Sequence, residues 1–278
     1  MIRAWAQSIK LDRWKSCDTL SLGNTNHLNQ LICSILRIDR KVDKNRAFFQ
    51  GFHFLYNNQQ NLQLGVDGYD DYQAPKDENG KSLFKRRLWV KGNIVFAPQK
   101  IHSIDCLEKI TSVRQIDQST FVQISREFTS QNLSILTESR TLMYTNQLYQ
   151  PAARSYPIET PSISTDIRLT AADLLKYSML TYNLHKIHYD LSYCQKVENL
   201  PNIILHGPFM ISLLLSWFSH HFPQLTIKSF NYKNLQPCFI NEDLKLSLIE
   251  KNDCYILSIV NHNQLEKYIE GTLDIYNN

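Results

Sequence analysis

The chain has 278 residues, 43% of them hydrophobic, and a net charge of +4 at pH 7. The composition excludes a disordered chain, and such a mild charge gives no reason to expect nucleic acid as a partner. No apolar run reaches the ~20 residues of a membrane-spanning helix; the longest, FMISLLLSWF, ends in Ser-His-His. We therefore expect a globular protein outside the membrane, built as two domains of about 130 residues or one fused unit.

The first 20 residues resemble a mitochondrial presequence. Basic and apolar side chains alternate through MIRAWAQSIKLDRWKS, in which Asp12 is the only acid. Such amphipathic, acid-poor segments are typical of import into mitochondria. The sequence thus predicts a presequence within residues 1–20 and a location in the mitochondrial matrix.

Residues 1–150 have the pattern of a helix followed by antiparallel strands. A helix is expected over 26–42, a short or degraded one between Arg46 and Asn57, and a turn-rich excursion over 57–81. Four runs rich in β-branched and aromatic residues then predict strands; they span 87–98, 105–116, 119–130 and 134–145. This segment reads as the first half of the protein.

Residues 151–165 contain prolines without periodicity and predict a linker, so that the second half spans 166–278. It begins with a short strand and a helix that Thr170 can cap. Residues 207–222 are apolar on nearly all faces, with Pro208 in the first turn, and predict a buried helix. Four strand-like runs follow it. One buried helix wrapped by antiparallel strands is typical of a hot-dog domain.

Two motifs stand at the centre of the second half. YNLHKIHYD covers residues 182–190, and ILHGPFMISLLL follows at 204–215. Together with FHFLY, LGVDGY, RRLWVKGNIVF and LTESRTLMY in the first half, they resemble the MaoC-like and type 2 hydroxyacyl-thioester dehydratases, above all those of fungal mitochondria. The resemblance implies an α+β double hot-dog fold, two antiparallel sheets each wrapping a central helix, with a degenerate first half and a catalytic second half.

The implied reaction removes water from a 3-hydroxyacyl thioester. It requires a base for the α-proton, a group for the departing hydroxyl and a dipole for the charge on the thioester oxygen. His188 stands where the family places its catalytic histidine, and imidazole suits a base near neutral pH. The Gly207 amide, at a helix N-terminus, suits the dipole. Asn183 falls at the position of the hydroxyl-binding group.

The sequence departs from the common family pattern at that third position. Many relatives have an acid where this chain has Asn183, and an asparagine where it has His185. Because an amide cannot release a proton, either Asn183 only orients the hydroxyl, or His188 makes both transfers, or Asp190 or His185 assists. His206 is expected to shape the turn before Gly207.

Cofactors and metals are not expected. His185 and His188 are spaced like half of a zinc site, but no further ligand stands at the expected spacing, among the six cysteines or elsewhere. The expected partner is an acyl carrier protein or an acyl-CoA. Basic residues that suit either are Lys85, Arg87, Lys91 and Lys186. In a regular strand, Lys85, Arg87, Trp89 and Lys91 share one face.

The sequence thus favours a lyase that dehydrates (3R)-3-hydroxyacyl thioesters on acyl carrier protein in mitochondrial fatty acid synthesis. A hydratase of short CoA thioesters would share the same motifs. A non-catalytic module that binds acyl groups or proteins is the alternative from another class, and the replacement of the family acid by Asn183 is its best argument.

Overall fold

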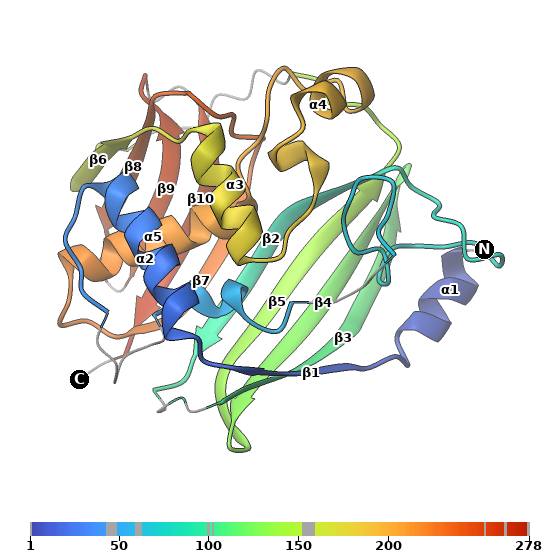
Figure 1. Ribbon diagram of the computed structural model, residues 1–278, viewed down its shortest axis with the longest axis horizontal. Coiled ribbons are helices and arrows are strands. Elements are labelled where there is room, and N and C mark those ends of the chain that lie inside the picture. Colours follow the sequence, from blue (N-terminus) through green and yellow to red (C-terminus); the bar gives the residue numbers. More distant parts are fainter. Residues whose placement is uncertain are drawn as a thin grey trace.

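Figure 1 shows a computed structural model of the chain, which describes residues 2–42, 49–58, 63–98, 101, 103–151, 159–252, 254–263 and 266–276. The first half contains α1 (Ile2–Ile9), β1 (Trp14–Thr19), α2 (Leu22–Leu36), η1 (Phe52–Leu55), β2 (Arg86–Phe96), β3 (Ser103–Ile116), β4 (Ser119–Ser130) and β5 (Leu133–Thr145). The second contains β6 (Ile163–Ile167), α3 (Ala171–Leu180), η2 (Lys186–His188), α4 (Leu191–Val197), α5 (Gly207–His221), β7 (Ile227–Asn234), β8 (Leu244–Glu250), β9 (Tyr255–Asn261) and β10 (Lys267–Ile275).

The strands of both halves join into one antiparallel sheet. Its order, within the described residues, is β1-β3-β4-β5-β2-β7-β10-β9-β8-β6. Read from each edge to the centre, the two halves have matching connectivity, and β2 meets β7 over residues 91–95. This arrangement confirms the α+β double hot-dog fold, with the two antiparallel halves joined edge to edge.

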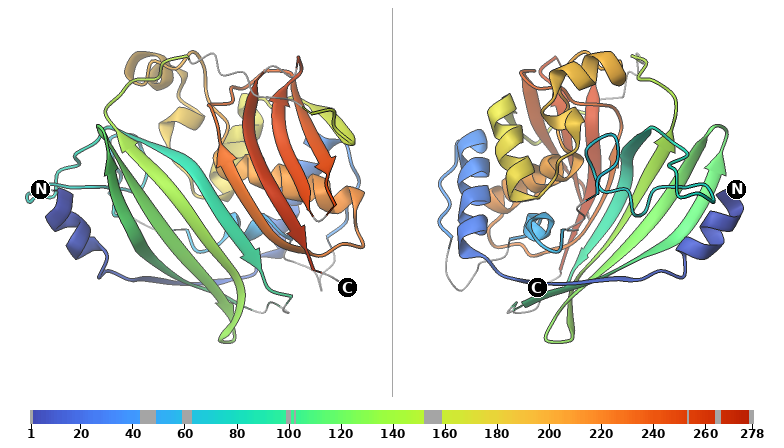
Figure 2. Two further views of the ribbon diagram at one scale, coloured as in Figure 1. Left: turned by 180° about the vertical axis from the view of Figure 1, so that it is seen from behind. Right: turned by 45° about the vertical axis from the view of Figure 1, so that its right-hand side comes forward.

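The helices α2, α3 and α5 lie on one face of this sheet (Figures 1 and 2). The helix α5 begins with Gly207 and Pro208, where proline is favoured because the first N–H groups have no partner within the helix. Ten of its fifteen residues are buried, from Phe209 to Phe218. It is the central helix that the apolar run predicts.

The first half has one turn of 3-10 helix, η1, in the equivalent place. This outcome agrees with the prediction of a short helix between Arg46 and Asn57, although residues 46–48 lie outside the described part. Gly51 precedes the turn with φ +87°, a conformation that favours glycine, and a Cβ there would lie 3.2 Å from Ser212 Cα. The Ser212 hydroxyl donates to Gly51 O at 2.7 Å, which fixes η1 on α5.

The N-terminal segment is part of the folded structure. Strand β1 pairs with β3, and Ile9 of α1 is buried in a second apolar cluster with Ile110, Val122 and Ile124. The segment for which the sequence predicts a presequence therefore supplies both a helix and the edge strand β1. The helix is amphipathic as predicted.

The predicted strands of the first half are confirmed almost residue for residue. The linker prediction lies partly outside the described residues, at 152–158, and β6 already begins at Ile163. Among the helices that the structure describes, none combines the length and the apolar character needed to span a lipid bilayer.

Candidate active site

The YNLHKIHYD segment forms a compact connection between α3 and α4. Tyr182 has φ +52°, and the Asn183 amide donates to Ser178 O at 2.9 Å, which ends α3. The Asn183 side-chain oxygen then accepts from the His185 amide at 3.1 Å. At the other end, Asp190 is the N-cap of α4 and accepts from the Tyr193 amide at 2.9 Å. The structure thus places Asp190 in a helix cap.

His188 is buried with one ring nitrogen bonded. Its Nδ1 lies 2.9 Å from the carbonyl oxygen of Ile204. Because a carbonyl can only accept, Nδ1 carries the hydrogen and Nε2 is the basic nitrogen of the neutral ring. Burial lowers the pKa of His188 to about 4, against the opposing effect of the Ile204 hydrogen bond. The imidazole is therefore a neutral base at physiological pH.

His206 and His185 contact His188 from two sides. The His206 ring stacks on it, with centroids 3.7 Å apart and planes 24° apart. The His185 ring meets it edge to face at 5.5 Å. The three histidines that the sequence singles out thus form one buried cluster, and His206 joins it directly to the first residue of α5.

Gly207 opens α5 beside this cluster. The first N–H groups of a helix lack partners within the helix, and its dipole favours negative charge there. A Cβ on Gly207 would lie 3.0 Å from the side-chain nitrogen of Asn234, which donates to Trp89 O at 2.8 Å. The glycine therefore keeps the helix N-terminus clear and lets β7 approach it.

His185 faces the first half of the protein. Its ring stacks on Tyr69 at 5.9 Å, and its Nε2 lies 3.5 Å from a carboxylate oxygen of Asp67. Asp67 is itself paired with Arg87 at 3.0 Å. Burial, together with the charges of His188 and Arg87, holds the pKa of His185 well below its ordinary value. His185 is neutral and engaged on several sides.

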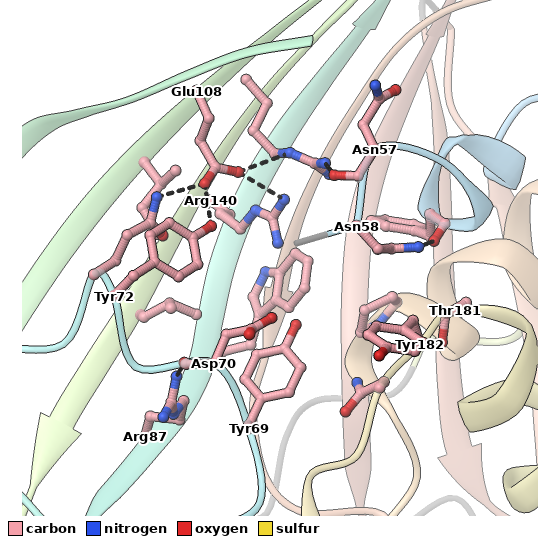
Figure 3. A pocket seen from close by; sticks show the side chains of 18 of the residues that line it. Asn57, Asn58, Tyr69, Asp70, Tyr72, Arg87, Glu108, Arg140, Thr181 and Tyr182 are labelled. Carbon is pink, nitrogen blue, oxygen red and sulfur yellow. Dashed lines mark hydrogen bonds and ion pairs between the residues drawn. The ribbon is translucent and has the colours of Figure 1, made fainter. Parts of the chain in front are cut away.

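A cleft that is open to solvent lies between the two halves. Its empty volume is about 730 Å³, including the solvent space at its open side. Figure 3 shows Tyr69, Asp70 and Arg140 on one side and Thr181 and Tyr182 on the other. Asn183 and Pro208 also line it. The connection after α3 and the N-terminus of α5 therefore meet at this cleft, as the predicted roles of Asn183 and Gly207 require.

The wall from the first half is unexpectedly polar. Four charged side chains on β3, β4 and β5 form a network of ion pairs; Glu108, Arg126 and Glu138 are buried, and Arg140 is partly buried. Figure 3 shows Glu108 and Arg140 of this network. Tyr72 and Gln73 donate to Glu108. Three members of this network, Glu108, Arg126 and Arg140, line the cleft.

The basic residues predicted for the partner are scattered. Trp89 pairs with Leu142 and Lys91 with Thr141, so a β-bulge at Val90 inserts one residue. A bulge reverses the alternation of side chains. The expectation that Lys91 shares the face of Arg87 and Trp89 is therefore wrong: Lys91 is exposed on the opposite face.

Arg87, Lys85 and Lys186 differ in their surroundings. Arg87 is largely buried against Asp67, whereas Lys85 is exposed and Lys186 donates to Val66 O at 2.9 Å. Asp67 and Tyr69 are partners of His185 that the motifs in the sequence do not predict. Their signal is the Asp-Gly turn of LGVDGYDD, but the turn alone does not predict which element it contacts.

The ten-stranded sheet and its central helix, which begins beside the buried histidine cluster, define a double hot-dog protein with a MaoC-like fold. A MaoC-like dehydratase from Phytophthora capsici has the same fold, with a TM-score of 0.71 and 14% identity over 98% of this chain and 97% of that one.

Residues 51–240 match the family model of the hydroxyacyl-thioester dehydratases type 2, and the chain belongs to that family. It is 30% identical to the mitochondrial hydroxyacyl-thioester dehydratase type 2 of Saccharomyces cerevisiae over 90% of this chain and 94% of the relative. The protein of the same name from Schizosaccharomyces pombe is also 30% identical, over 80% of this chain and 84% of its own length.

Proposed function

We propose that this chain is a hydro-lyase that converts (3R)-3-hydroxyacyl thioesters to trans-2-enoyl thioesters and catalyses the reverse hydration. The observation that carries the proposal is the neutral, buried imidazole of His188 beside the N-terminus of α5. Such a pair joins a base to a dipole that stabilises a developing oxyanion. Family membership fixes the thioester as the substrate class.

The first step takes a proton from the substrate. His188 Nε2 removes the α-proton, and the C–H electron pair moves toward the thioester carbonyl. Charge develops on the thioester oxygen, where the Gly207 N–H donates a hydrogen bond. The glycine allows the thioester to approach the backbone closely.

The second step expels the hydroxyl group. The C–O bond breaks as the Cα=Cβ double bond forms, and the protonated His188 returns its proton to the departing oxygen, so that water leaves and the imidazole is neutral again. Asn183 orients the hydroxyl through its amide. Asp190 caps α4 and His185 is held by its neighbours, so neither is assigned a proton transfer.

The physiological substrate is proposed to be an acyl group on acyl carrier protein in mitochondrial fatty acid synthesis, in the matrix. Support comes from the names of both yeast relatives, which include the word mitochondrial. Lys85 and Lys186 suit an acidic carrier by charge: Lys186 lies over the Tyr193 ring of α4, and Lys85 is exposed just before β2. A hydratase of CoA thioesters would use the same site.

The test is hydration of crotonyl-CoA and of crotonyl-acyl carrier protein by the purified chain. Loss of enoyl thioester absorbance, with (3R)-3-hydroxybutyryl thioester as the product, is the expected result. A folded protein that binds the thioester without converting it would show a non-catalytic acyl-binding module instead.

A further inference from the structure

His206 has contacts that a turn residue does not need. Its side chain is fully buried, and its ring lies flat against His188 with centroids 3.7 Å apart. Its Nε2 lies 2.9 Å from the hydroxyl oxygen of Ser178 on α3, itself 2% exposed. His206 therefore links α3, the first residue of α5 and the face of His188.

The hydrogen bond to Ile204 does not by itself fix the His188 ring. A ring held at Nδ1 alone can still tilt about that bond, and a tilt moves Nε2, the nitrogen on the opposite side. Contact over a whole face removes that freedom and keeps water from the ring. His185 touches only the edge, at 5.5 Å.

We propose that His206 is a positioning residue: its imidazole, tied to Ser178, holds the ring of His188 in the plane that presents Nε2 to the substrate. This inference rests on the proposed function, because it assigns His206 a part in the same reaction. The role is distinct from shaping the turn before Gly207, which any residue with a suitable backbone conformation could do.

Charge supports the same assignment. Burial, followed by the charges of His188 and His185, holds the pKa of His206 well below its ordinary value. A neutral ring that covers the face of His188 excludes water without adding a charge, and burial is what lowers the pKa of His188. The charged groups nearest to the histidine cluster are Asp67 and Arg87, and both lie on the side of His185.

The neighbours of His206 itself are uncharged. Tyr177 of α3 lies 5.0 Å from its ring centroid, and Phe209 of α5 lies 6.5 Å away. Burial raises the pKa of Tyr177, so its phenol stays protonated. Of the side chains that contact His206 in the described part of the chain, Tyr177, Phe209 and Ser178 therefore keep the same charge over the pH range of the kcat/KM profile.

The experiment compares His206→Ala, His206→Phe and Ser178→Ala with the parent protein. Replacement by alanine opens the face of His188 to water, and a misplaced base loses on the order of 100-fold in kcat. The acid limb of the pH profile of kcat/KM should then move toward higher pH, while KM changes little. Phenylalanine again covers the ring face of His188, so His206→Phe should recover most of kcat and return the acid limb to nearly its parental pH. Ser178→Ala should lie between them.

His220→Ala, at the exposed end of the same helix, is the matched control and should change neither quantity. A folded His206→Ala protein with parental kcat and pH profile would overturn the inference. The inference would also be overturned if His206→Ala and His206→Phe lost kcat equally and the acid limb did not move, because a purely structural role predicts that result.

A readout without turnover separates this inference from the proposed function. In nitrogen NMR spectra, His188 should keep its hydrogen on Nδ1 and titrate at low pH in the parent protein and in His206→Phe. In His206→Ala, His188 should keep its hydrogen on Nδ1, bonded to Ile204, but titrate at higher pH because water reaches its open face. Unchanged His188 signals in the alanine variant would refute positioning, whereas an inactive parent protein with the expected signals would refute only the dehydratase assignment.

Discussion

The Nδ1 atom of His188 lies 2.9 Å from the carbonyl oxygen of Ile204, and this hydrogen bond leaves Nε2 as the basic nitrogen. Ile204 itself stands three residues before Gly207 in the connection that leads into α5. The same short segment therefore sets the tautomer of the proposed base and carries the amide that we propose faces the oxyanion.

The activity should persist to unusually low pH for a histidine base. The pKa of folded His188 is about 4, so the imidazole remains neutral well below its ordinary value of 6.5. We expect kcat/KM to stay constant from pH 8 to about pH 5.5 and to fall only below it. An acid limb centred near pH 6.5 would contradict a buried neutral base.

The free energy of unfolding should decrease as the pH falls below about 6.5. Unfolding exposes His188 and returns its pKa to the ordinary value, so between pH 6.5 and pH 4 the unfolded chain binds the proton and the folded chain does not. Stability is then lost as the pH decreases. Urea denaturation at a series of pH values measures it, and His188→Gln should reduce the dependence in part, because the pKa values of His185 and His206 are lowered by burial as well.

Gly207→Ala should impair turnover without unfolding the protein. Alanine is a better helix former than glycine, but its Cβ would lie 3.0 Å from the Asn234 side chain, and one of the two must shift. Alanine keeps the backbone N–H, but the shift displaces it, and we expect kcat to fall about 100-fold, the scale of a misplaced oxyanion donor. Gly23→Ala, in the first turn of α2, is the control. Thermal melting distinguishes lost activity from lost structure.

The proposed binding of the acyl carrier protein by Lys85 and Lys186 can be tested with Lys91 as the control, because the bulge at Val90 places Lys91 on the opposite face of β2. Reversing Lys85 and Lys186 to Glu should raise KM for acyl carrier substrates, more at low salt than at high, and spare small CoA esters. Lys91→Glu, on the opposite face of β2, should change neither. Equal effects on both substrate types would assign these lysines to the fold or to the CoA phosphates.

The helix α1 provides a test of the N-terminal segment. Ile9→Ala in the full chain removes a buried side chain from the second apolar cluster and should cost about 2 kcal/mol or more in the free energy of unfolding. Gln7→Ala, exposed on the same helix, should cost little. Equal, negligible effects would mean that α1 does not contribute to the folded state.

Much of the fold was predictable because local patterns determine it. The strands β3 to β5 follow alternation over 105–116, 119–130 and 134–145, and α5 follows an apolar run opened by Gly-Pro. Strand β1 was missed because WKSCDT has little strand character by itself; its pairing with β3 is a long-range contact.

The site was predictable as far as its motif extends along the chain. His188 and Gly207 lie in adjacent segments, and the sequence suffices to name them. The contacts of His185 with Asp67 and Tyr69 could not be predicted in this way, because they form only when the loop after η1 folds against the second half. Arg87 joins them through Asp67. Nor does alternation reveal a bulge, which is why Lys91 was assigned to the wrong face.

The most direct measurement is the hydration of crotonyl-CoA, followed by enoyl absorbance, for the parent protein and for His188→Ala of unchanged circular dichroism. With His188 as the sole base, the variant should lose about 100-fold or more in kcat, because general base catalysis contributes on that scale. Near-normal turnover by the folded variant would contradict the account.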